Sequence, residues 1–182
     1  MKLNTLLTHS PLLFALAFTT QGFAAKSDVT KDSSATKTLS AIIALDQSEV
    51  MTSIDASHKK SSEDVADFAK MMIEDHGKNF SDALELANKI HALPLSNNTE
   101  IAGKEMKELT TLGSLDGDEF DHAYIDAMVK GHSAALTLVE EKLKSAKDDD
   151  LKSFLSSTKD AISHHLDEAK NLQDKIQRQG VK

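Results

Sequence analysis

The sequence predicts an all-α fold, and three observations support this prediction. Ala, Leu, Lys, Glu and Asp dominate the 182 residues, whereas only two prolines and seven glycines occur. Apolar residues recur every three or four positions over four long stretches, which is the period of an amphipathic helix. No stretch alternates apolar and polar residues as a half-buried strand does.

Four long helices are expected, and local signals set their ends. The first spans 38–58, with an apolar stripe of Leu39, Ile43, Val50 and Ile54 that Asp46 and Ser53 interrupt. The second begins near Ser61, which has Asp64 three residues later, and ends before Pro94. The third begins at its N-cap Asp116 and ends near Lys147, and the fourth spans 151–176, with Gly180 beyond it.

The lengths of the connections predict how these helices pack. The first and second helices, and likewise the third and fourth, are joined by very short connections, so each pair forms an antiparallel hairpin. The connection after Pro94 is long enough to cross the bundle and holds a short helix at about 100–112. Four amphipathic helices with one long crossover predict a ferritin-like four-helix bundle. A simple up-and-down bundle with a folded loop is the alternative.

The N-terminal segment predicts export. Lys2 precedes an apolar run at 12–18, and small residues precede a cleavage site after Ala24. We therefore expect a signal peptide over 1–24, a disordered linker over 25–36 and the bundle domain over 37–178. The mature protein would be periplasmic or secreted, and it has no further segment apolar enough to span a membrane. An uncleaved anchor is the alternative for residues 1–24.

Composition excludes several classes of function. The net charge is −8 without basic clusters, so binding to nucleic acid or anionic lipid is not expected. The chain has no cysteine, which excludes disulfides and thiolate chemistry. No glycine-rich phosphate loop and no nucleophile–base motif occurs, so the sequence does not favour an enzyme. It does not identify a protein partner either.

The most informative residues are three histidines on the apolar faces of three different helices. His76, His132 and His165 lie near the middle of the second, third and fourth expected helices. His76 and His132 each lie about 15 residues, or roughly 22 Å, from the start of their helices. A buried imidazole needs a hydrogen bond, an ion pair or a metal. We therefore predict a site at mid-bundle under either topology.

The first helix offers a further donor. Glu49 lies at the edge of the stripe, about one turn from the histidine level, and is the candidate for a fourth metal ligand. Asp46 faces inward but lies further from that level, so it is expected to be a solvated carboxylate. Three imidazoles and a carboxylate suit a divalent metal such as Zn²⁺, Cu²⁺ or Fe²⁺. The alternative is three structural histidines with no cofactor, each bonded to a carbonyl or carboxylate.

A carboxylate-bridged di-iron oxidase is not expected. The sequence Glu119-x-x-His122 has the spacing of a di-iron motif, but it lies in the first turn of its helix. Glu119 there is better explained as a capping partner for Asp116. Too few inward carboxylates remain at mid-bundle for this chemistry.

The strings QSEV, DFAKMMIEDH, EFDHAYIDAMVKGH and HHLDEA together resemble the bacterial domain-of-unknown-function family 4142. The resemblance covers roughly residues 38–176, and members of this family are often labelled outer membrane proteins. It implies an exported ferritin-like bundle, but it implies no biochemical activity. Its recurring positions fall on Glu49, His76, Tyr124, His132 and His165. A metal-binding bundle and a non-enzymatic envelope, stress or interaction protein with structural histidines are thus both compatible with the sequence.

Overall fold

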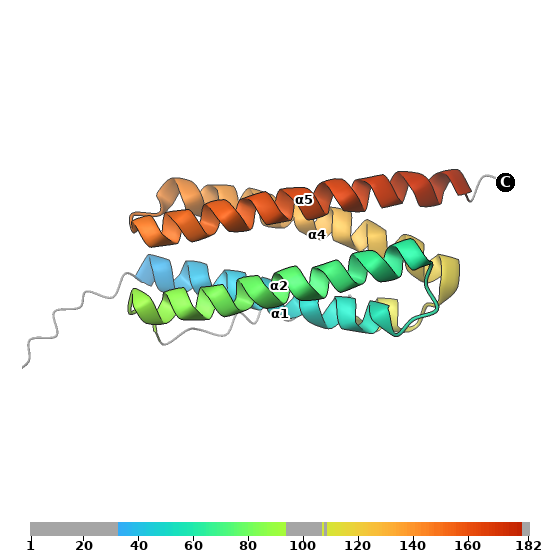
Figure 1. The fold of residues 1–182 in the computed structure, drawn as a ribbon, viewed down its shortest axis with the longest axis horizontal. Helices are drawn as coiled ribbons and strands as arrows, with labels where there is room; N and C mark the ends of the chain where they lie inside the picture. Colours follow the sequence, from blue (N-terminus) through green and yellow to red (C-terminus); the bar gives the residue numbers. More distant parts are fainter. Residues whose placement is uncertain (1–32, 94–106, 108, 180–182) are drawn as a thin grey trace, which may run out of the picture. The chain divides into compact units, whose positions relative to one another are not determined.

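Four long α-helices form a bundle in the computed structural model of the chain (Figure 1), which describes residues 33–93, 107 and 109–179. They are α1 (Ser33–Ser57), α2 (Glu63–Lys89), α4 (Gly117–Ser145) and α5 (Asp149–Gln179). Residues 107 and 109–113 are also helical, in agreement with the short helix predicted at about 100–112. The described residues contain no strand, so the all-α prediction is confirmed.

Contacts at the helix ends establish the connectivity. The backbone N–H of Ser62, just before α2, donates to Asp121 in the first turns of α4, over 2.9 Å. At the other end of α2, Lys89 forms an ion pair of 2.8 Å with Asp150 at the start of α5. The helices α2 and α4 therefore begin at the same end of the bundle (Figure 1). The end of α2 and the start of α4 therefore lie at opposite ends of the bundle, as the predicted long crossover requires.

This is the connectivity that ferritin-like bundles with one crossover use. Closer kinship with that fold stays a prediction. The predicted signal peptide over 1–24, most of the predicted linker, Pro94 and Gly180 lie outside the described residues. No described helix is long and apolar enough to cross a membrane.

Helix α1 differs from the prediction at its start and on its buried face. It begins at Ser33, so the last four residues of the predicted linker are helical; Ala35 is buried there and packs against the core. Ile54, predicted to be inward, is 43% exposed, whereas Asp46 and Ser53 are buried. The apolar pattern misplaced the stripe because these two polar side chains have hydrogen-bonding partners on other helices.

The core divides into two apolar clusters along the bundle. One contains Leu39, Ile42, Leu86 and Val139, and the other contains Phe68, Met72, Tyr124 and Met128. On α2, α4 and α5 the three candidate histidines fall between residues of the first cluster and residues of the second. The bundle thus has a polar layer between two apolar halves, and this layer holds the candidate site.

Candidate metal centre

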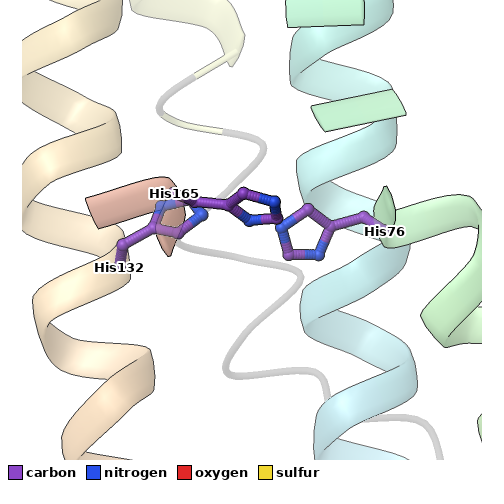
Figure 2. Close-up of side chains that lie close together, drawn as sticks. All are labelled: His76, His132 and His165. Carbon is purple, nitrogen blue, oxygen red and sulfur yellow. The ribbon is translucent and has the colours of Figure 1, made fainter. Parts of the chain in front are cut away.

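The three predicted histidines converge in this polar layer from three helices (Figure 2). The ring centroids of His76 and His165 are 5.1 Å apart, and the ring of His132 lies 5.6 Å from each of them. All three residues are buried, with exposed fractions between 1% and 6%. The predicted meeting of the three side chains at one level is therefore confirmed.

Each ring is held by a hydrogen bond through one of its two nitrogens. His76 Nδ1 lies 2.8 Å from a carboxylate oxygen of Asp46, and His165 Nε2 lies 3.0 Å from one of Asp75. His132 Nδ1 lies 2.9 Å from the backbone carbonyl of Met128, one turn earlier in α4. All three partners are acceptors, so each of these nitrogens carries the proton when the ring is neutral.

The opposite ring nitrogens point to a ligand. His76 Nε2, His132 Nε2 and His165 Nδ1 are buried and have no hydrogen-bond partner among the described residues. In a neutral ring whose proton lies on the other nitrogen, each of these atoms presents a lone pair. Three buried lone pairs without a donor are costly for the fold, and a bound cation would satisfy all of them at once.

The spacing of the rings fits one metal ion after a small adjustment. One nitrogen from each histidine lies within 4.8 Å of the other two. Two nitrogen ligands of a tetrahedral zinc ion, with bonds of about 2.0–2.1 Å, are about 3.4 Å apart. Each of the three nitrogens would therefore move inward by at most about 0.8 Å, which small torsional changes can supply.

Burial and charge affect the three imidazoles differently. Burial, together with the neighbouring His76 and His165, lowers the pKa of His132 to about 3. Burial also lowers the pKa of His165, and the hydrogen bond to Asp75 only partly opposes it. For His76, burial alone would lower the pKa, but Asp46, Glu49 and Asp75 together raise it above its usual value. At neutral pH, His132 and His165 are thus uncharged and able to bind a metal.

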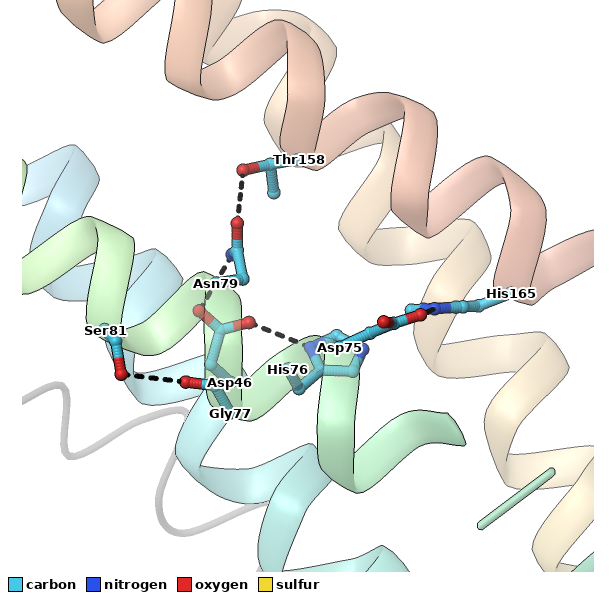
Figure 3. A network of polar contacts seen from close by, with 8 residues as sticks. All are labelled: Asp46, Asp75, His76, Gly77, Asn79, Ser81, Thr158 and His165. Atoms are coloured by element: carbon cyan, nitrogen blue, oxygen red, sulfur yellow. Dashed lines mark hydrogen bonds and ion pairs between the residues drawn. The ribbon is translucent and has the colours of Figure 1, made fainter. Parts of the chain in front are cut away.

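Asp46 was not expected at the site, and the prediction that it is solvated is wrong. It is 2% exposed, and its two oxygens accept hydrogen bonds from His76 Nδ1 and from Asn79 Nδ2, the latter over 2.9 Å. Asn79 in turn accepts a bond of 2.9 Å from the hydroxyl of Thr158 on α5 (Figure 3). Burial raises the pKa of Asp46 against these two bonds. We take Asp46 as anionic because both of its oxygens accept.

This network ties α1, α2 and α5 together beside the histidines. One sequence signal could have revealed it: Asn79 follows His76 by three residues, which places both on the same face of α2. An acid on the apolar stripe of the preceding helix is then the natural acceptor for both.

Glu49 lies beside the site. It lines a cavity of about 10 Å³ together with His76, His132 and Asp46. Its oxygens are not in the set of ligand atoms that lie within 4.8 Å of one another, which the three histidines alone form among the described residues. Direct ligation by Glu49 therefore stays a prediction.

The remaining candidates have other roles. His58, His91, His122 and His164 are exposed, as expected of histidines outside the site, and His9 lies outside the described residues. Tyr124 is buried one apolar layer away, where its hydroxyl forms a hydrogen bond of 2.9 Å with Ser53.

Comparison with known proteins places the chain in a family. Comparisons with curated proteins and with solved structures found no match. The model of the family described as "Domain of unknown function (DUF4142)" matches residues 19–172, which is most of the chain and includes all four long helices except the end of α5. The protein therefore belongs to the DUF4142 family.

Proposed function

We propose that this protein is an exported helical bundle that binds one divalent metal ion through His76, His132 and His165. The observation that carries the proposal is the arrangement of the ring nitrogens. In every ring one nitrogen is bonded to a fixed acceptor, and the other is buried without a partner among the described residues. Metal-binding histidines in general have this arrangement, since the outer acceptor fixes both the tautomer and the ring orientation.

The donor set limits the choice of metal. Three imidazoles and no thiolate favour Zn²⁺, Cu²⁺ or Fe²⁺ over soft ions such as Cu⁺. The nearby carboxylates Asp46 and Asp75 add negative charge that favours a divalent cation. Glu49, the fourth donor that the sequence predicts, lines the cavity that adjoins the histidines.

Export is the second part of the proposal. It is supported by the sequence pattern of residues 1–24, with cleavage after Ala24. Fractionation of cells followed by N-terminal sequencing tests it: a mature chain that begins at Ala25 in the periplasm or medium is expected. A full-length chain retained in the cytoplasm would contradict it.

Metal binding is tested on the mature chain without a histidine tag. After chelator treatment, titration with Zn²⁺, Cu²⁺ and anaerobic Fe²⁺ is followed by calorimetry, and the metal content is measured by elemental analysis. One ion per chain is expected for at least one metal, together with a melting temperature that rises on metal addition and falls with chelator. His132→Ala should lose this binding, whereas His164→Ala, which removes an exposed neighbour of His165, should retain it.

The competing function is a non-enzymatic envelope, stress or interaction protein in which the histidines are structural. In that case neither metal nor chelator would change the melting temperature of the wild-type protein. This measurement does not depend on any variant folding, so a negative result overturns the metal proposal directly.

A further inference from the structure

The small cavity beside the histidines has a composition that suits a single polar ligand. His76, His132, Asp46, Glu49 and Thr158 supply its polar groups, and its other lining residues are the apolar Ile42, Leu45, Ala135 and Ile162. Its volume of about 10 Å³ corresponds to roughly one water-sized particle. The cavity is thus too small for an organic substrate.

Two of the three histidines, His76 and His132, line this cavity, so it adjoins the predicted metal centre. A three-histidine centre leaves a fourth coordination position, and in zinc proteins an open position of this kind holds water or substrate. None of the described residues that line the cavity contains sulfur, and the carboxylate of Asp46 is already hydrogen-bonded to His76 and Asn79.

Glu49 is placed to contact such a ligand. Its Oε1 lies 3.6 Å from the position that a Cβ on Gly131 would occupy, directly before His132 on α4. Its carboxylate therefore reaches across from α1 toward α4. It nevertheless lies outside the group of ligand atoms within 4.8 Å of one another, whereas two ligands of one ion are about 3.4 Å apart. Glu49 therefore lines the cavity beside the three histidines but is not grouped with their nitrogens as a ligand.

On the basis of the proposed function, we infer that the centre is an open site whose fourth ligand is one exogenous water or hydroxide, which occupies the cavity and donates a hydrogen bond to Glu49. The ligand class is limited to single-atom donors by the volume of the cavity. The charge of Glu49 favours a hydrogen-bond donor there and disfavours an anion.

Electron paramagnetic resonance of the Cu²⁺-loaded mature protein tests this inference. Nitrogen couplings report the bound imidazoles, and exchange into D₂O reports a bound water through its deuterons. We expect three imidazole nitrogens and one exchangeable ligand. Fluoride, which has the size of one water, should displace that ligand, whereas the larger benzoate should not.

Two variants separate the possible roles of Glu49. Glu49→Gln should keep the three nitrogen couplings, change the Cu²⁺ affinity by less than about tenfold, and lower the fluoride concentration needed by at least about tenfold, since a nearby negative charge is removed. Glu74→Gln removes an equal charge from an exposed position two residues from His76 and should leave fluoride binding unchanged.

The outcomes distinguish this inference from the proposed function. The open site would be overturned if the spectrum shows three nitrogen couplings without an exchangeable deuteron and Glu49→Gln loses more than about 100-fold in Cu²⁺ affinity. Glu49 would then be the direct fourth ligand. Displacement of the ligand by benzoate would overturn the size limit. Absence of the nitrogen couplings would instead refute the metal centre itself.

Discussion

Replacement of Asp46 by alanine should destabilise the protein even without a metal. The carboxylate is buried and accepts from two side chains on α2, His76 and Asn79, at 2.8 and 2.9 Å. Asp46→Ala removes the acceptor of two donors, the buried imidazole of His76 and the half-buried amide of Asn79. The effect does not require a metal, because Asp46 bonds His76 through Nδ1, whereas the unpartnered nitrogen of that ring is Nε2.

The magnitude follows from the groups left unpaired. Each buried donor without an acceptor costs about 1–3 kcal/mol, and loss of one partner of a buried pair costs about 3–5 kcal/mol. Removal of the burial penalty of the carboxylate itself, which raises the pKa of Asp46, offsets part of this cost. We expect a net loss of about 3 kcal/mol, which for a domain of this size corresponds to a fall in melting temperature of roughly 6–12 °C.

Asp46→Asn serves as the matched variant. The oxygen of its new amide can still accept from His76. If the Asn79 amide turns over, its oxygen accepts from the new amide N–H and its own N–H donates to the Thr158 hydroxyl. We expect a loss of less than about 1.5 kcal/mol for this variant.

Urea denaturation of the chelator-treated proteins measures both values. If Asp46→Ala loses less than about 1 kcal/mol, or no more than Asp46→Asn, then the buried network contributes little to stability and the reasoning is refuted. In the presence of metal, Asp46→Ala should also lower the metal affinity by about 10–100-fold, because the tautomer of His76 is no longer fixed.

Three further predictions concern other parts of the bundle. The pKa of His132 falls from 6.5 unfolded to about 3 folded, so stability is complete above pH 6.5 and is lost as the pH falls toward 3. This loss amounts to at most about 5 kcal/mol. Urea denaturation of the metal-free proteins between pH 7 and 4 should show a much smaller loss of stability in His132→Leu than in the wild type. If the free energy of unfolding falls equally with pH in both proteins, the lowered pKa of His132 is not the cause. Ser53→Ala and Tyr124→Phe should each cost about 1–2 kcal/mol, and the double variant should cost clearly less than their sum, which a double-mutant cycle measures. Ile54→Asn should change stability by less than about 0.5 kcal/mol by the same assay, since Ile54 is 43% exposed. A loss typical of a core residue would show that Ile54 is buried, as the apolar pattern of the sequence predicts.

Most of the fold could be predicted because its signals are local. Periodicity located all four long helices, and the lengths of the connections predicted the hairpins and the crossover. The ends were less accurate: α1 begins at Ser33 instead of 38, and the N-cap of α2 is Ser62 instead of Ser61. Helix ends depend on contacts such as the burial of Ala35, which periodicity does not report.

The sequence by itself determined where the histidines meet, because helical period and chain connectivity place His76, His132 and His165 on inward faces at mid-bundle. Only the tertiary structure decided what each ring contacts. Whether Asp46 is solvated or buried depends on the rotation of α1 against α2. Which nitrogen of His76 and of His165 lacks a partner depends on acceptors on neighbouring helices, Asp46 and Asp75. The acceptors of His76 and His165 are distant in sequence, so most of the chemistry of this layer follows from packing between helices.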